Sequence, residues 1–119
     1  MKIATFDNAI ANKVKDLRSE GINPTALWAY RDSIRTGNEL IDFHDVIWEE
    51  DIVAIADTLK ENGIDEFTIS CNFSGLIQTL VEFEKVGYRM VGTTEVNATY
   101  RDIFTNDFSR IPALKMCRI

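Results

Sequence analysis

The chain has 119 residues, of which 45 % are hydrophobic and 27 % are charged, and its net charge is −6. This balance is typical of one soluble globular domain spanning residues 1–119, and the acidity disfavours direct binding to nucleic-acid phosphates. The sequence shows no signal-peptide pattern, no disulfide framework and no apolar run near the roughly 20 residues that span a bilayer, so we expect a cytoplasmic protein that does not bind membranes.

Two helices are predicted in the first third of the chain. Apolar residues at helical spacing favour the first helix over residues 6–20, with Gly21 after its end. The second helix begins at Asn23-Pro24, a capping residue followed by a proline at the first helical position. It is expected to end at Gly37, because glycine is common just past a helix end.

A third helix is predicted to begin near Glu49 or Glu50 and to end at Asn62-Gly63. Acidic residues in its first turn suit the positive end of the helix dipole. Between the second and third helices, residues 38–48 fit either a short helix or an extended connection. Residues 1–63 are therefore expected to form a mainly helical part.

Residues 65–119 are expected to form a β-α-β-β unit. “EFTISC” (66–71) alternates as a strand does, a helix follows from about residue 76, and strands are predicted in 88–96 and 111–119. The first two strands should run parallel, with the last one added antiparallel. The predicted fold is thus an α+β domain, in which N-terminal helices pack on a small mixed sheet of three to four strands.

The segment “EFEKVGYRMVGTTEV” (82–96) is similar to the C-terminal half of the GNAT acyltransferase superfamily. The closing “PALKMCRI” also resembles the final strand of that family, and the similarity covers residues 66–119. The resemblance implies the scaffold without its chemistry. No glycine-rich loop for coenzyme A occurs, and Phe83 and Leu76 stand where the family often has a tyrosine and an asparagine. The chain also resembles small uncharacterised proteins of bacterial mobile elements, which implies no mechanism.

The stretch “ELIDFHDVIWEED” (39–51) holds six carboxylates and the only histidine of the chain, with no lysine or arginine. If the stretch is helical, Asp42, Asp45 and Glu49 share one stripe and His44 lies away from them. If it is extended, Asp42 and His44 share a face that Asp45 leaves. Because neither geometry gathers all four, we predict no metal site and interpret the stretch mainly as a solvated acidic face.

Recognition of a basic surface is the alternative role of this stretch. An aromatic residue inside a charged rim is typical of protein interfaces. Trp48 also fits a core position, and we favour the core position over the interface. If the stretch does bind a partner, the expected contacts are Asp42, Asp45, Trp48, Glu49, Glu50 and Asp51.

A second candidate is the turn “SCNFSG” (70–75), where a strand leads into a helix. Asn72 or Ser74 would cap the helix, with Gly75 allowing close packing; as the functional alternative, Asn72, Ser74 and Gly75 would contact an anion or small ligand. Arg101, in the irregular segment 95–110, is a further possible anion contact. Cys71 alternates with apolar residues, so we expect a buried, inert thiol rather than a nucleophile.

Taken together, the residues favour a non-catalytic accessory or regulatory module that binds a basic protein partner through its acidic segment. No catalytic residue or cofactor is predicted, although enzyme activity is left open. The alternative is a degenerate GNAT-like acyltransferase or small-ligand-binding domain. Homodimerisation through an open sheet edge is a further possibility, and the sequence does not reveal which edge.

Overall fold

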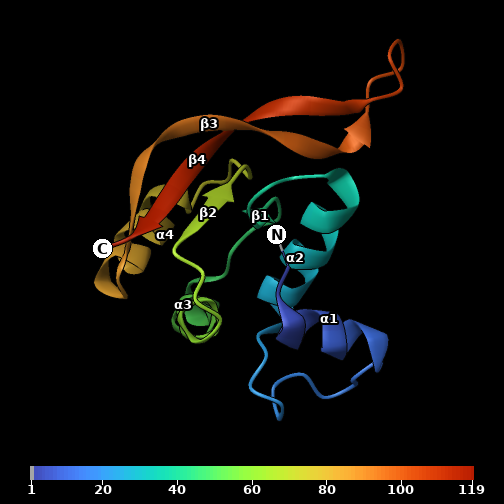
Figure 1. The fold of residues 1–119 in the computed structure, drawn as a ribbon. Helices are drawn as coiled ribbons and strands as arrows, with labels where there is room; N and C mark the ends of the chain where they lie inside the picture. Colours follow the sequence, from blue (N-terminus) through green and yellow to red (C-terminus); the bar gives the residue numbers. More distant parts are fainter. Residues whose placement is uncertain (1) are drawn as a thin grey trace.

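The computed structural model describes residues 2–119 and has the predicted α+β class (Figure 1). Its helices are α1 (Ala4–Ala11), α2 (Pro24–Thr36), the short 3-10 helix η1 (Glu49–Asp51), α3 (Ile52–Glu61) and α4 (Leu76–Lys85). Its strands are β1 (Asp42–Phe43), β2 (Glu66–Ile69), β3 (Tyr88–Arg101) and β4 (Phe108–Arg118). No helix among residues 2–119 has the length and apolarity needed to cross a membrane.

The four strands form one mixed sheet in the order β1-β2-β4-β3. β1 pairs parallel with β2, whereas β4 pairs antiparallel with both β2 and β3. β2 and β3 therefore run in the same direction, as predicted, but the last strand lies between them. Residues 38–48 form an extended connection that contains β1, so the predicted helical part also contributes a strand.

The predicted first helix is wrong in its length. α1 ends at Ala11 because Lys13 adopts a left-handed backbone, and the Val14 amide closes the turn on the Ala9 carbonyl. A second such turn, closed by the Ile22 amide on the Leu17 carbonyl, follows before α2. Two consecutive turns thus produce the apolar spacing that a single helix would have produced.

The ends of the second and third helices agree with the sequence prediction. The Asn23 side chain accepts a hydrogen bond from the Ala26 amide, and Gly37 ends α2 with a φ of 77°. η1 and α3 together fill the predicted range up to Gly63, whose φ is 68°. At both C-terminal ends the left-handed backbone is one that glycine adopts without strain.

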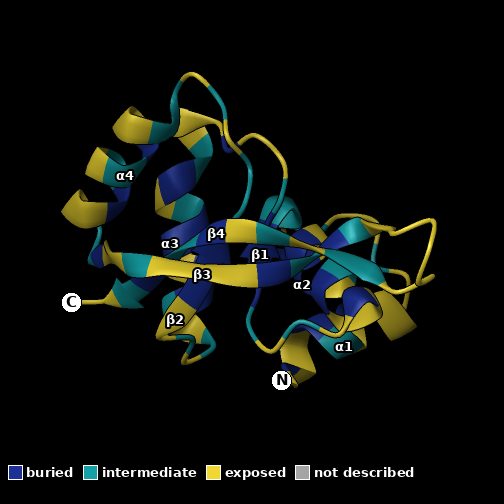
Figure 2. Ribbon diagram, turned by 90° about the horizontal axis from the view of Figure 1, so that it is seen from above, coloured by how far each residue is buried: buried dark blue, intermediate teal, exposed yellow. Residues whose placement is uncertain are grey.

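The core lies between the sheet and the helices. Phe67 of β2 lies at its centre, with ring centroids at 5.4 Å from Phe43, 5.2 Å from Phe83 and 5.3 Å from Tyr88. Four elements, β1, β2, α4 and β3, therefore meet at one side chain. The N-terminal helices cover the sheet only in part: α2 contacts β1 and β3, while residues 89–95 of β3 are mainly exposed (Figure 2).

Candidate functional site

The acidic residues of 39–51 do not share one face. Asp42 is only 3 % exposed, whereas Asp45, Glu49 and Glu50 are exposed and Asp51 lies 3.8 Å from an Arg18 nitrogen. The predicted solvated surface therefore includes most of the acids but not Asp42. Because β1 makes this part of the stretch extended, Asp42 points inward and Asp45 does not lie beside it on one helical stripe.

Asp42 connects β1 to β2 through its buried carboxylate. Its two oxygens accept hydrogen bonds of 2.6 Å each from Thr68 Oγ1 and Ser70 Oγ. Its backbone amide donates to Ser33 Oγ of α2 at 2.9 Å. This residue was predicted as a partner contact, but its burial assigns it to the structure of the sheet.

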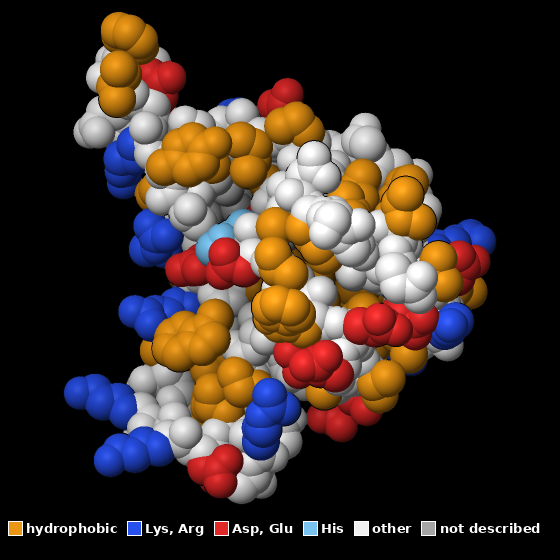
Figure 3. Space-filling view, turned by 180° about the vertical axis from the view of Figure 1, so that it is seen from behind, with side chains coloured by type: hydrophobic (Ala, Val, Ile, Leu, Met, Phe, Trp, Pro, Cys, Tyr) orange, Lys and Arg blue, Asp and Glu red, His pale blue; other side chains and the backbone are white. Residues whose placement is uncertain are grey.

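His44 lies between two carboxylates. Its Nε2 is 2.7 Å from Asp32 Oδ2 of α2, and its Nδ1 is 3.5 Å from Asp45 Oδ1. The other oxygen of Asp32 lies 3.7 Å from Arg35. Figure 3 shows the histidine beside acidic side chains, with hydrophobic side chains on either side. Asp32 was not predicted as part of this group, because its contact with His44 depends on α2 packing against β1.

Two exposed tryptophans border this polar group. Trp28 is 52 % exposed and Trp48 is 64 % exposed, so the prediction that Trp48 belongs to the core is wrong. Trp48 points outward because the chain leaves β1, buries Ile47 and only then turns into η1. Together the two indoles line a hollow of about 160 Å³, which is also lined by Thr25, Ala29, Asp32, Phe43, His44, Asp45 and Val46.

A second hollow of about 330 Å³ lies at the start of α4 and shares Val46 and Trp48 with the first. It brings Trp48 and Glu49 together with Ser74 and Gly75, two candidate sites that are far apart in the sequence. The predicted capping role is wrong, since Gly75 occupies the N-cap position and no side chain bonds there. The remaining lining residues are Ile47, Phe73, Gln78 and Thr79.

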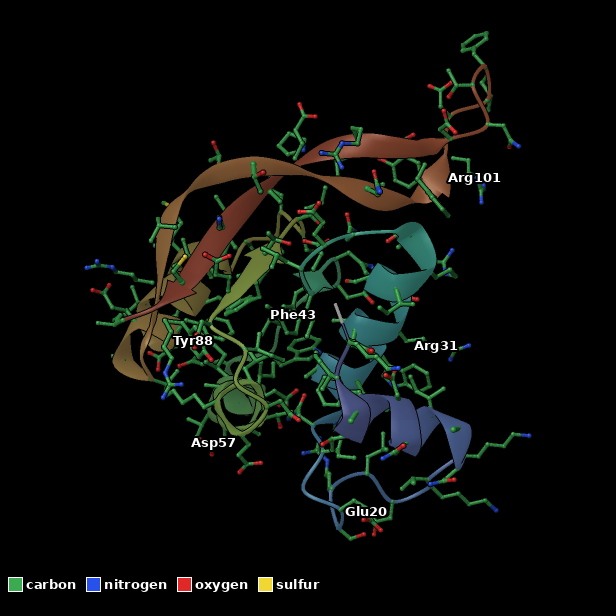
Figure 4. All side chains as sticks on the ribbon, in the orientation of Figure 1. Glu20, Arg31, Phe43, Asp57, Tyr88 and Arg101 are labelled. Carbon is green, nitrogen blue, oxygen red and sulfur yellow. The ribbon has the colours of Figure 1, made fainter. Side chains whose placement is uncertain are left out.

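Arg101 lines neither of these two hollows, and its contacts are within the β3–β4 hairpin. It lies at the end of the β3–β4 hairpin (Figure 4), donates to the Asn106 carbonyl at 2.8 Å and covers the Phe108 ring at 4.1 Å. Asn72 is exposed and does not line either hollow beside Trp48. The predicted anion contacts therefore do not come together into one site.

Cys71 is half-buried near the acidic residues rather than fully buried. Burial raises the pKa of the Cys71 thiol, and the Asp45 and Asp42 carboxylates raise it further. A raised pKa keeps the thiol protonated at neutral pH, which opposes nucleophilic activity. Among residues 2–119, no three histidine, cysteine or acidic side chains are grouped so that they could hold a metal ion.

The position of Cys71 gives a first testable expectation. With Cys117 replaced by serine, alkylation of Cys71 by iodoacetamide should reach half its maximal rate at a pH above the ordinary thiol pKa of about 8.5. Asp45→Asn should lower that midpoint, because it removes one of the negative charges that raise the pKa of the thiol. Asp57→Asn, on the exposed surface of α3, should leave it unchanged. A midpoint insensitive to Asp45→Asn would contradict this arrangement.

Comparison with known proteins gives one match. A family described as “Domain of unknown function (DUF7698)” matches residues 25–118. No curated protein and no solved structure matches the chain. The matched range contains all four strands and every residue that lines the two hollows beside Trp48.

Proposed function

The chain belongs to the DUF7698 family, whose description assigns no activity, and we propose from the geometry that it is a non-catalytic accessory or regulatory module that binds a partner protein. The partner presents a basic surface and places a lysine or arginine side chain in the hollow between Trp28 and Trp48. The observation that carries this proposal is the pair of exposed indoles beside exposed carboxylates.

The chemistry of the hollow favours a cation. A lysine or arginine over an indole face is stabilised by about 0.5–2 kcal/mol, depending on how far the pair is desolvated. Trp28 already holds one such contact, because the Arg31 guanidinium carbon lies 5.1 Å from its ring centroid. Asp45 borders the hollow, and Glu49 lies next to Trp48 on its other side. These carboxylates supply the charge that complements a basic side chain.

The experiment uses a short arginine-rich peptide as the probe, with a glutamate-rich peptide of the same length as the negative control. Both tryptophans of the chain border the hollow, so binding should change the intrinsic fluorescence. Affinity for the basic peptide should fall as the salt concentration rises. Trp48→Ala should weaken it about tenfold or more, as expected for a central aromatic contact.

A matched pair of variants separates the site from general acidity. Glu49 and Glu39 are both exposed glutamates of the acidic stretch, but only Glu49 lines a hollow beside Trp48. Glu49→Gln should therefore weaken binding more than Glu39→Gln does. Equal effects of the two variants, or an affinity unchanged by Trp48→Ala, would refute the proposed site.

The alternative is a degenerate GNAT-like acyltransferase or small-ligand-binding domain. The hollow at the start of α4, with Ser74 and Gly75 in its lining, is the feature that favours it. Acetyl-coenzyme A at 100 times its Kd would stabilise such a domain by about 2.7 kcal/mol, which a thermal-shift assay detects. A shift with acetyl-coenzyme A and none with the basic peptide would replace the first proposal by this one.

A further inference from the structure

A hollow of about 250 Å³ lies between α3 and the turn that precedes α2. One wall is a stripe of α3 whose residues recur at spacings of three and four, and the other wall is the turn. The lining residues are Ala54, Asp57, Thr58 and Glu61 from α3, with Arg18, Gly21, Ile22 and Asn23 from the turn. The hollow shares no residue with the two hollows beside Trp48, so it is a separate feature of the molecule.

Asn23 brings to this hollow a hydrogen-bond donor that has no acceptor. Asn23 is 4 % exposed, and among residues 2–119 its Nδ2 is the only buried side-chain nitrogen or oxygen without a partner. The orientation of the amide group is fixed, because Asn23 Oδ1 accepts from the Ala26 amide at 3.0 Å and the nitrogen must then lie on the other side. A buried donor without an acceptor is costly, and native structures rarely keep one without a reason.

Thr58 and Arg18 add further donors to the same hollow. Thr58 is 4 % exposed, and its Oγ1 accepts a hydrogen bond from the Asn23 backbone amide at 3.3 Å. A hydroxyl that accepts one hydrogen bond still carries a proton to donate. The Arg18 side chain is 66 % exposed and lies 3.8 Å from Asp51. Three residues therefore offer N–H or O–H groups to one acceptor group, such as a carboxylate.

Asp57 and Glu61 give the hollow a negative side. Both are exposed and lie four residues apart on α3, and Figure 4 shows Asp57 on the side of α3 away from the sheet. Two carboxylates oppose a simple anion such as phosphate. A metal ion is opposed by Asn23, because its oxygen is engaged with Ala26 and only the amide NH₂ is free. A ligand with both an acceptor group and a cationic group satisfies both sides.

We propose that this hollow binds a free α-amino acid. The carboxylate of the ligand accepts hydrogen bonds from Asn23 Nδ2 and the Thr58 hydroxyl, and its ammonium group faces Asp57 and Glu61. Side chains three and four residues apart on a helix have Cβ atoms about 5–6 Å apart, which suits two charged groups carried on one carbon atom.

The size and the apolar lining of the hollow fit such a ligand. Its volume of about 250 Å³ is far larger than the roughly 10–15 Å³ that one water molecule needs. Ile22 and Ala54 supply an apolar part of the lining, against which the side chain of the amino acid packs.

A thermal-shift screen of the full chain against the standard L-amino acids tests the site, and calorimetry then gives the affinity of the best ligand. At least one amino acid should raise the melting temperature, because a ligand that binds only the folded chain stabilises it. The N-acetyl derivative of that amino acid lacks the ammonium charge, and its carboxamide lacks the carboxylate. Each derivative should bind at least about tenfold more weakly, the usual effect of losing a hydrogen bond to a charged group.

Matched variants test the two sides of the hollow separately. Asn23→Asp keeps the cap of α2, since aspartate caps a helix as well as asparagine does, but it replaces the unpaired donor by an acceptor. This variant should weaken binding at least about tenfold. Asp57→Asn and Glu61→Gln, both on the exposed surface of α3, should each weaken it about threefold. Glu20→Gln, an exposed substitution in the same turn but outside the lining, is the control and should have no effect.

A screen in which no amino acid stabilises the chain would overturn the proposal. So would a ligand that binds Asn23→Asp and Asp57→Asn as tightly as the wild type. If Asn23→Asp does not fold, Asp57→Asn and the N-acetyl derivative decide the question, because they leave the cap of α2 intact. The amino acid should not displace the basic peptide from the hollow between Trp28 and Trp48, since the two hollows share no residue. Either proposal can therefore fail without the other.

Discussion

Phe67→Ala should lower the free energy of unfolding by about 3–5 kcal/mol, the usual cost of removing a fully buried phenylalanine ring. Phe67 is 0 % exposed, and its ring contacts three other aromatic rings from β1, α4 and β3. Each of these contacts is edge-on or tilted, a geometry that adds about 0.5–1.5 kcal/mol to simple burial. The three rings come from three different elements, so none of them can fill the cavity left by Phe67 without moving away from its own element.

Urea unfolding followed by far-UV circular dichroism measures this loss. Phe104→Ala is the matched control, because Phe104 is 90 % exposed at the end of the β3–β4 hairpin. This variant should change the free energy of unfolding by no more than about 0.5 kcal/mol. Similar losses for the two variants would mean that Phe67 is not where the core is centred.

Asp42→Ala should cost about 2–3 kcal/mol, although it removes a charge from the interior. Its two oxygens are the acceptors for the Thr68 and Ser70 hydroxyls. A buried hydroxyl without an acceptor costs about 1–3 kcal/mol of stability. Removing a buried charge also removes its desolvation penalty, and this gain offsets only part of the cost of the two unpaired hydroxyls. Asp42→Asn keeps one acceptor oxygen in place and should cost less than Asp42→Ala.

Chemical denaturation of Asp42→Ala, Asp42→Asn and Asp45→Ala separates these effects. Asp45 is exposed in the same stretch, and its removal should change stability by no more than about 0.5 kcal/mol. The slope of unfolding free energy against denaturant should stay the same if the variants unfold in the same way. An Asp42→Ala variant as stable as Asp45→Ala would contradict the structural role of this carboxylate.

The local chemistry of the sequence was enough to place α2, and it was not enough for α1. Asn23, Pro24 and Gly37 act within one turn of their own positions, so their effect is readable without knowing the rest of the fold. At the end of α1 the left-handed residue is Lys13, which carries no such signal. The apolar residues after Lys13 lie in a second turn, and their spacing alone cannot distinguish two short turns from one continuous helix.

The candidate site was predictable only in its composition. The sequence predicted the acidic stretch mainly as a solvated face, with partner contacts as the alternative, and it predicted Trp48 as a core residue. Which of these residues point outward depends on the two residues of β1, a strand too short to show alternation. The same strand brings His44 to Asp32 and buries Asp42. Long-range packing therefore decides the geometry, and Trp28 was not among the predicted contacts for that reason.

The place of β4 in the sheet sets an order of events during synthesis. β2 leaves the ribosome about 40 residues before β4 begins, which at about 5–20 residues per second is a delay on the order of a few seconds. Until then β2 has only the two residues of β1 to pair with, and β3 has no strand beside it, because both β2 and β3 pair with β4 in the finished sheet. The nascent chain thus carries an incomplete sheet, and a ribosome-bound chain that ends before residue 108 should be far more sensitive to protease than one that includes β4.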